Sequence, residues 1–548
     1  MIRVFTASSL TDIFPETKPT DRDTYALHMA RNEGEGFQIG VYAPEGVTEL
    51  RAAVDCAVPH VTFEVHGIGL VPFSKNTVHI GSRSVRAKAP GVLPEYFTDL
   101  PLTVPAGESR ALYVSVRTDT EAPAGDYAGT VRLEAEGFAA AVPFTLRVYD
   151  VTLPPPEESA MTYVCWSTLT DPDHTRNVYG IEMWSEEYWT YVRNCARIMR
   201  SQRQNMISME LQNVLLYRLT TGEDGQLQYD FTMFDKFAEI MLDKEYMGVR
   251  YLCGMHMMAR DWFYDVAPGT SWSQRPLIAW VFEKQEDGTY HQAWKPASDP
   301  CVEAFQRHLF TVLGAHLREK GWDKIWFQHV SDEIDNDIHY QQTLAVYQII
   351  HECMPGARTI DAVRPESPYT FGAELDIHVP TIWQHDMAPY AYAALQRGNT
   401  EVWQYTCLQP QYEYLSRLGD YPLAATRLLG WYNYRWRLTG FLHYAWNNYN
   451  PCVKRYDPYA DASCFGSFPC DAFIVYPDRE HLTVHESVRS EAQRDAFEDY
   501  ELWRLAEQKA PDTVRRLAEA VVPAANAYTR NTEFLAALRI RLLEIAQG

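Results

Sequence analysis

Two adjacent carboxyl groups, Asp332 and Glu333, are the residues most suited to do chemistry in this chain. They lie near the end of the stretch KIWFQHVSDEID, in which apolar residues typical of a buried strand lead directly into acids. Adjacent carboxylates repel each other, and burying them is costly unless they are paired or protonated. Their position therefore indicates a functional pair. The alternative is that Asp332 caps the next helix, since aspartate is a favoured N-cap residue.

The spacing of the pair constrains the reaction. Most glycosidases place two carboxyl groups on opposite sides of the scissile bond, about 5–5.5 Å or about 6.5–9.5 Å apart. Neighbours on an extended strand point to opposite faces, but a turn at the strand end brings both toward one ligand from the same side. That geometry suits a reaction in which Glu333 protonates the leaving oxygen. Asp332 would then orient a substrate group that acts as the nucleophile, such as the 2-acetamido group of an N-acetylhexosamine.

Eight short apolar stretches follow one another after residue 159, and any of them could be a strand that carries such a pair. Amphipathic segments of helical length separate them. The predicted strands are 161–168, 205–212, 250–257, 324–333, 358–363, 376–383, 401–407 and 440–448. Eight strands alternating with helices is the count for a (β/α)8 TIM-type barrel. An open doubly wound sheet is the alternative, although no glycine-rich phosphate-binding fingerprint is present.

The ends of these predicted strands gather acids, histidines and aromatic residues. In a (β/α)8 barrel the active site lies at the C-terminal ends of the strands, and this composition suits a sugar pocket. The predicted substrate-binding residues are His256, Trp383, Trp403, Tyr405, Trp446 and Asn447. Each aromatic residue could equally belong to the core, and His256 and His329 could be packing or supporting residues.

Residues 1–152 are predicted to form a β-sandwich. Alternation of apolar and polar residues on both sides of Gly137 predicts a hairpin with one buried face, and further short strands with Pro/Gly turns favour a sandwich. The proline-rich segment 153–159 is predicted to be a linker. A catalytic barrel over 159–510 and a C-terminal helical extension over 511–548 would follow. The charge run SEAQRDAFEDYE is expected to be mostly a solvated helix face, with Arg489 and Asp495 bracing the helix.

Composition excludes some classes of partner. The net charge of −23 repels phosphate backbones, so nucleic-acid binding is not expected. No run of about 18 apolar residues predicts a membrane span. The 10 cysteines show no zinc-binding spacing, so free thiols and no metal are expected. Together with an N-terminus lacking an apolar leader, this favours a cytoplasmic protein, with a removed signal as the alternative.

Three features resemble glycoside hydrolase family 123, the β-N-acetylgalactosaminidases. They are the VSDEID stretch, the N-terminal PAGDYAGTV within a sandwich, and a C-terminal pattern. That pattern comprises Tyr476–Pro477, Ser487, Arg489, Arg494–Asp495 and Asp499–Tyr500–Glu501. Two positions depart from it, because many relatives have proline where Ile334 stands and often glycine where Ala496 stands.

The resemblance implies residue roles. Glu333 would be the general acid and later the base, and Asp332 would hold the acetamido N–H. By similarity to family 20 hexosaminidases, Tyr405 would form a hydrogen bond to the acetamido oxygen. Trp446 would pack against the face of the sugar ring. The implied activity is a retaining, cofactor-free exo-glycosidase that removes terminal β-linked N-acetylgalactosamine from glycans.

Two alternatives stay open. The first is a glycosidase of the same fold acting on another sugar, such as N-acetylglucosamine. The second is a non-catalytic glycan-binding protein. The expected partner is a glycan or glycoconjugate substrate, and a homodimer is compatible with the sequence.

Overall fold

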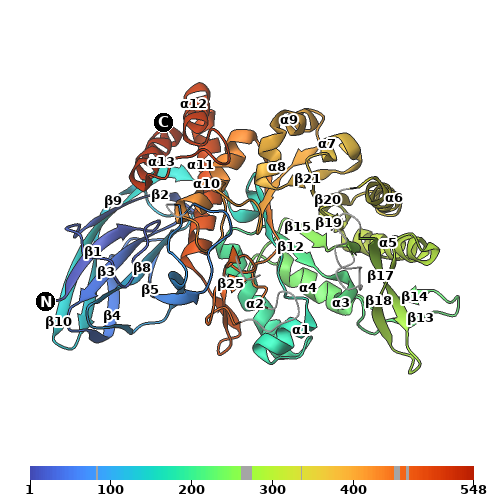
Figure 1. Cartoon of the computed structure of the whole chain (residues 1–548), viewed down its shortest axis with the longest axis horizontal. Coiled ribbons are helices and arrows are strands. Elements are labelled where there is room, and N and C mark those ends of the chain that lie inside the picture. Colours follow the sequence, from blue (N-terminus) through green and yellow to red (C-terminus); the bar gives the residue numbers. More distant parts are fainter. Residues whose placement is uncertain (82–83, 261–274, 335, 450–456, 465–467) are drawn as a thin grey trace.

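The computed structural model describes residues 1–81, 84–260, 275–334, 336–449, 457–464 and 468–548. Figure 1 shows the N-terminal sheets at one end of the long axis and the parallel strands with their helices toward the other. The last helices lie over the region between these two parts.

The N-terminal part consists of two five-stranded sheets around one apolar core. The first has the order β1 (Arg3–Ser8), β3 (Gly34–Ala43), β8 (Glu108–Thr118), β5 (Val61–Phe73) and β6 (Gly91–Thr98). The second has the order β2 (Tyr25–Arg31), β10 (Phe138–Thr152), β9 (Gly125–Ala135), β4 (Val47–Asp55) and β7 (Leu102–Val104). Phe37 of the first sheet meets Phe144 of the second, with ring centroids 5.6 Å apart.

The predicted hairpin is confirmed. Strands β9 and β10 pair antiparallel, with Phe138 opposite Ala135. Gly137 makes the turn at φ 68°, a left-handed conformation that glycine adopts without a side-chain clash. The apolar positions of both strands, such as Val131 and Leu146, are buried as their alternation predicts.

Parallel strands form at each of the eight predicted positions. They are β11 (Thr162–Cys165), β12 (Met206–Met209), β15 (Tyr251–Gly254), β19 (Trp326–Asp332), β20 (Arg358–Val363), β21 (Ile377–Pro380), β22 (Glu401–Val402) with β23 (Gln404–Thr406), and β24 (Gly440–His443). Among the described residues they pair as two sheets, β12-β15-β19-β20-β21-β22 and β11-β24-β23, so the ladder does not run continuously around a closed barrel.

The two parallel sheets touch at both of their edges. A parallel bridge joins Thr381 to Tyr405. On the other side, the backbone N–H of Asn205 donates to the carbonyl of Tyr163 at 3.2 Å, and the Asn205 side chain accepts from the Tyr163 N–H at 2.8 Å. The C-terminal strand ends of both sheets therefore border one region.

Helices alternate with these strands, as the amphipathic segments predict. They are α1 (Pro172–His174), α2 (Glu186–Ser201), α3 (Leu211–Val214), α4 (Thr232–Leu242), α5 (Pro300–Lys320), α6 (Asp337–Cys353), α7 (Ser367–Thr370), α8 (Ile382–Met387), α9 (Pro389–Arg397) and α10 (Leu423–Trp436). The side chains of Ser185, Asp299 and Asn336 accept backbone N–H bonds at the starts of α2, α5 and α6. Such caps fix where each helix begins.

Short antiparallel strands interrupt the alternation of parallel strands and helices at places where the sequence pattern predicts no strand. They are β13 (Thr220–Thr221) with β14 (Leu227–Gln228), β16 (Met258–Arg260) with β17 (Leu277–Lys284) and β18 (Tyr290–Pro296), β25 (Ser463–Cys464) with β26 (Phe468–Pro469), and β27 (Tyr476–Asp478) with β28 (Thr483–His485). The β16-β17-β18 sheet lies between β15 and α5 in the sequence.

The prediction of a solvated charge run was wrong. The run lies in α11 (Val488–Lys509), where every residue from Val488 to Trp503 is buried. Figure 1 shows α11 between the N-terminal sheets and the rest of the molecule. Its charges are paired there, because Arg427 of α10 donates to Asp495 at 3.0 Å and to Asp499 at 2.7 Å. The same guanidinium reaches Glu35 of β3 at 2.6 Å, which ties the two parts together.

Arg489 was predicted to brace a helix against the barrel, and it ties α11 both to the N-terminal sheets and to residues after β24. Its guanidinium pairs with Glu95 of β6 at 2.8 Å and donates to the carbonyl of Phe473 at 3.1 Å. The chain then ends in α12 (Pro511–Val521) and α13 (Thr532–Gln547). From α13, Arg539 donates to Asp499 at 2.8 Å and so joins the same buried network.

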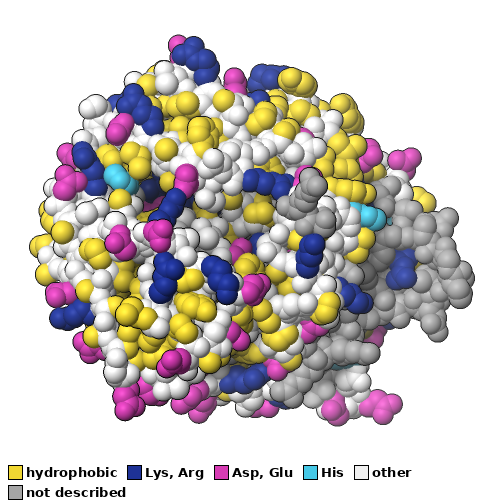
Figure 2. All heavy atoms as spheres, turned by 60° about the vertical axis from the view of Figure 1, so that its left-hand side comes forward, with side chains coloured by type: hydrophobic (Ala, Val, Ile, Leu, Met, Phe, Trp, Pro, Cys, Tyr) yellow, Lys and Arg dark blue, Asp and Glu magenta, His cyan; other side chains and the backbone are white. Residues whose placement is uncertain are grey.

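The face over the N-terminal sheets carries acidic and basic side chains interspersed with apolar ones (Figure 2). Within the described part of the chain, no helix is both long enough and apolar enough to cross a bilayer.

Candidate active site

The acid pair lies at the end of β19, where the strand stops being regular. The pairing of β19 with β20 shifts register between His329 and Asp332. Asp332 still pairs with Ala362, and the backbone N–H of Glu333 bonds to the carbonyl of Ala362 at 3.0 Å. Glu333 itself has φ 47°, a left-handed conformation that is uncommon for a residue with a side chain. The strand therefore turns sharply at the two carboxyl groups.

Asp332 does not cap the following helix. The N-cap of α6 is Asn336, whose side chain accepts from the backbone N–H of His339 at 3.0 Å. The capping alternative for the acid pair is therefore wrong. Asp335, which completes the quoted stretch, lies outside the described residues.

Glu333 is held by groups from two other strands. The hydroxyl of Tyr405, in β23, donates to Glu333 Oε1. Arg364, just after β20, places Nη2 3.7 Å from Glu333 Oε2 and donates from Nε to the Glu333 carbonyl at 3.3 Å. The Glu333 side chain keeps 29% of its surface exposed. A substrate can therefore reach a carboxyl group whose position is fixed.

Asp332 lies in an environment that disfavours its charge. Burial, the neighbouring Glu333 and the nearby Asp361 raise the pKa of Asp332 to about 7, against opposing attraction from Arg260 and Arg364. Two carboxylates in one poorly hydrated site are expected to behave in this way. Burial, together with Glu333 and Asp332, also raises the pKa of Tyr405 and of Cys407. The two carboxyl groups therefore face the same region.

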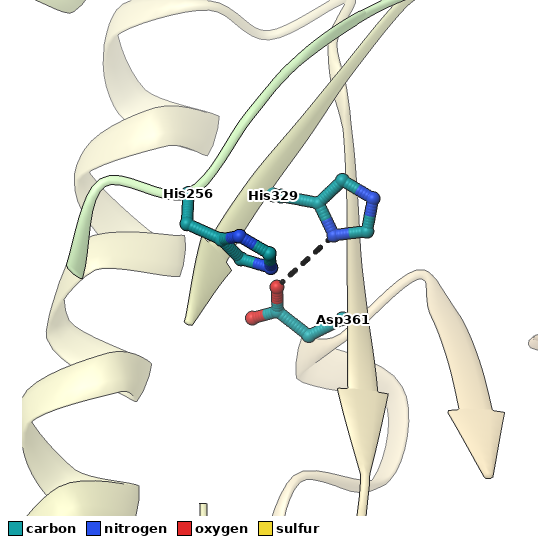
Figure 3. Close-up of side chains that lie close together, drawn as sticks. All are labelled: His256, His329 and Asp361. Atoms are coloured by element: carbon teal, nitrogen blue, oxygen red, sulfur yellow. Dashed lines mark ion pairs between the residues drawn. The ribbon is translucent and has the colours of Figure 1, made fainter. Parts of the chain in front are cut away.

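His256 and His329 lie beside this pair. Figure 3 shows both rings next to the carboxylate of Asp361, with His329 Nδ1 3.4 Å from Asp361 Oδ1. Trp166 packs edge-on against both rings, at centroid distances of 4.8 and 5.0 Å. Burial lowers the pKa of each histidine to about 3. Neutral imidazoles, an indole and a carboxylate therefore line this side of the site.

Trp383 follows β21 in α8. Its side chain is half-buried, and its Nε1 is a buried donor with no hydrogen-bond partner among the described residues. A ligand oxygen could accept from it. Trp383 therefore stays a predicted substrate contact.

Three predicted contacts are structural residues. Trp403 is fully buried among apolar residues of the parallel strands, and its Nε1 donates to Glu401 at 3.1 Å. Trp446 is fully buried in a different cluster and donates to Gln202 at 2.8 Å.

Asn447 accepts from the Thr168 N–H and donates to the Tyr191 hydroxyl, both at 3.0 Å. Predicting Trp403, Trp446 and Asn447 as sugar contacts was wrong, because their surfaces and polar atoms are already satisfied inside the protein.

Sequence reasoning missed Arg364, Asp361 and Trp166. Arg364 directly follows the predicted strand 358–363, so reading that strand end would have found it. Asp361 and Trp166 stand inside predicted strands. Nothing in the sequence distinguishes them from core positions until the neighbouring strand is placed beside them.

The two departures from the family pattern lie in the core. Ile334 is 1% exposed and Ala496 is fully buried. Ala496 lies where α11 approaches Gly430 of α10 closely. Neither side chain is available to contact a substrate directly.

Comparisons with known proteins show similarity to one family of glycoside hydrolases. The family model of the glycoside hydrolase 123 catalytic domain matches residues 170–506. A family 123 glycoside hydrolase from Clostridium perfringens, solved to detail glycolipid glycan hydrolysis, has a similar structure at TM-score 0.76. It shares 14% identity over 100% of this chain and 97% of its own.

Other structural likenesses are weaker. A family 10 xylanase from termite gut reaches TM-score 0.34 at 9% identity, covering 88% of this chain and 100% of its own. A β-glucuronidase from Parabacteroides merdae reaches 0.31 at 9% identity, covering 91% of this chain and 52% of its own. No curated protein matches the sequence.

Proposed function

Because this chain belongs to glycoside hydrolase family 123, we propose that it removes terminal β-linked N-acetylgalactosamine with retention, using the substrate's own acetamido group as the nucleophile. The observation that carries the proposal is the turn at the end of β19. There the left-handed Glu333 follows Asp332 directly, so both carboxyl groups reach one region from one strand end. A nucleophile and an acid of the two-carboxylate kind lie on opposite sides of the scissile bond, whereas Asp332 and Glu333 come from the same strand end.

Each group has a defined task in this reaction. Glu333 donates its proton to the glycosidic oxygen as the bond to C1 breaks. The acetamido carbonyl oxygen attacks C1 from the opposite face and forms an oxazolinium ion. Asp332 accepts a hydrogen bond from the acetamido N–H and stabilises the positive charge on the oxazolinium ring. Water then attacks C1, Glu333 takes the proton from that water, and the acetamido group is restored with overall retention.

Tyr405 supports the acid in this reaction. Its hydroxyl donates to Glu333 Oε1 in the substrate-free site, which keeps the carboxyl group in a single orientation. The family resemblance gives this tyrosine a bond to the acetamido oxygen. Tyr405 would then exchange one acceptor for the other when substrate enters.

We also propose that the two parallel sheets act together as one (β/α)8 barrel. The bridge from Thr381 to Tyr405 and the paired bonds between Asn205 and Tyr163 support this, because they join the sheets at both edges. The strand ends that carry Asp332, Arg364 and Tyr405 would then form one rim, as the barrel architecture requires of an active site.

The direct test is hydrolysis of paired chromogenic substrates: the β-N-acetylgalactosaminide, the β-N-acetylglucosaminide and the plain β-galactoside. We expect cleavage of the first only, with retention visible by proton NMR of the released sugar. Glu333→Gln should abolish it, whereas Asp337→Asn, an exposed acid in the first turn of α6, should retain it. Oligosaccharides of glycolipids that end in this sugar are the natural substrates to test next.

The other outcomes separate the alternatives. Cleavage of the N-acetylglucosaminide would change the sugar but keep the mechanism. Turnover of plain galactoside at a comparable rate would refute the acetamido mechanism and require a separate nucleophile. Failure on all three substrates, with tight binding of a thiazoline mimic, would identify a glycan-binding protein.

A further inference from the structure

A group of metal-ligand type side chains lies on β19, the strand that ends at Asp332, and on or just after the strands next to it. His256 follows β15, His329 lies in β19 and Asp361 lies in β20, which are three neighbouring strands of one sheet. One ligand atom from each lies within 4.8 Å of the others. Figure 3 shows the two rings and the carboxylate directed toward one another.

The ring nitrogens of this group have no hydrogen-bond partner among the described residues. These are Nε2 of His256 and both Nδ1 and Nε2 of His329, all of them buried atoms, and His329 Nδ1 lies in an ion pair with Asp361 Oδ1 at 3.4 Å. His329 is fully buried. Buried polar side-chain atoms are nearly always satisfied, so several unpaired nitrogens in one place indicate a missing ligand. At least one nitrogen of a neutral imidazole carries a free lone pair, which a metal ion can accept.

We propose that His256, His329 and Asp361 form a site for a transition-metal cation of the Zn²⁺ class. Two imidazoles and one carboxylate, with a fourth position left for water, is a donor set of open zinc sites. A tetrahedral ion with bonds of about 2.1 Å separates its ligand atoms by roughly 3.4 Å. The observed 3.4 Å between His329 Nδ1 and Asp361 Oδ1 equals this spacing.

The surroundings hold the ligands in place. Asp361 accepts from the backbone N–H groups of Val330 at 2.9 Å and Ser331 at 3.1 Å, and from the Tyr347 hydroxyl at 2.6 Å. The carbonyl of His256 accepts from Trp280 Nε1 at 2.9 Å. Bonds of this kind orient metal ligands and are themselves important for affinity. The carboxylate of Asp361 is therefore fixed in position.

This site goes beyond the proposed glycosidase function, because the acetamido route needs no metal. It also differs from the sequence expectation of no metal. That expectation came from cysteine and histidine spacing, whereas these ligands are 73 and 32 residues apart and meet only through strand pairing. Metal binding can therefore be measured whether or not the glycosidase proposal holds.

The test is titration of the full chain, treated with EDTA and exchanged into metal-free buffer, with ZnCl₂ by isothermal calorimetry. We expect one Zn²⁺ bound per chain. His256→Gln and His329→Gln should each weaken that binding by at least about tenfold. With Co²⁺ in place of Zn²⁺, visible absorption bands of a tetrahedral ion should appear, and both substitutions should remove them.

The matched control is the double substitution of His481→Gln and His485→Gln. These histidines flank Asp478 at 2.9 and 3.8 Å, so they form a second histidine–aspartate group away from the acid pair. They should not contribute to the measured site.

Absence of binding, or binding that the control removes and the two ligand substitutions leave unchanged, would overturn the proposal. If His329→Gln lacks a cooperative melting transition, that variant is not folded and cannot be used. The test then depends on His256→Gln alone, because His256 is only half-buried. Unchanged Zn²⁺ affinity in His256→Gln would then overturn the proposal.

Discussion

Replacing Asp332 with asparagine should stabilise the folded protein at neutral pH while removing assisted hydrolysis. The pKa of Asp332 is raised from an ordinary value of 3.8 to about 7 by burial, Glu333 and Asp361. The folded state therefore binds a proton that the unfolded chain releases. The contribution of Asp332 to the free energy of unfolding is fully present below pH 3.8 and is lost as the pH rises through about 7. Asparagine resembles the protonated acid and avoids that loss.

The size of the effect follows from the shift. A rise of about 3 units at about 1.36 kcal/mol each gives about 4 kcal/mol lost above pH 7, and about 1.5 kcal/mol lost at pH 5. Part of this free energy belongs to the charged groups around Asp332 rather than to its own proton. We expect the substitution to gain about 2 kcal/mol more at pH 8 than at pH 5. For 548 residues that equals roughly 2 °C in melting temperature.

Differential scanning calorimetry at pH 5 and pH 8, at one ionic strength, measures this difference. Asp337→Asn provides the control, because Asp337 is exposed and should give the same small shift at both pH values. A stabilisation by Asp332→Asn that is equal at pH 5 and pH 8 would refute the reasoning. So would a loss of stability at pH 8.

Three further substitutions test the support around the site. Tyr405→Phe removes the bond to Glu333, so kcat/KM should fall about 10- to 100-fold, and an unchanged value would argue against this contact. Arg427→Ala leaves the buried carboxylates of Glu35, Asp495 and Asp499 undercompensated. Calorimetry should show a loss of about 3–5 kcal/mol, and a normal melt would contradict it. Gly430→Ala drives a methyl group into the α11 backbone. It should cost about 1–3 kcal/mol in urea unfolding, whereas a neutral effect would show that the helices can separate.

Much of the strand pattern could be read from the sequence. The stretches around β19 and β20 form strands where continuous apolar runs predicted them, because a strand covered on both faces needs apolar residues on both. The β9–β10 hairpin was readable from alternation and from Gly137. The acid pair was identified by its types and its place at a strand end.

The candidate contacts were less predictable. Trp383 and Trp446 both lie toward the C-terminal ends of predicted strands, 376–383 and 440–448. Yet Nε1 of Trp383 has no partner in the described part of the chain, whereas Trp446 donates to Gln202 inside the core. The charge run in α11 was wrong in the opposite direction. It was predicted to be exposed to solvent, but Arg494 and Asp499 are fully buried. Composition cannot show whether a charge will meet a partner from another part of the chain.

The sequence by itself determined the positions of the strands, the acid pair and the membership of a hydrolase family, because these depend on local patterns and short motifs. Only the tertiary structure decided the contacts that arise between distant segments. Pairing of β15, β19 and β20 brings His256, His329 and Asp361 together. Packing of α11 against the N-terminal sheets turns a charged helix into a core element. These outcomes depend on distances between strands and helices, and a linear sequence does not contain such distances.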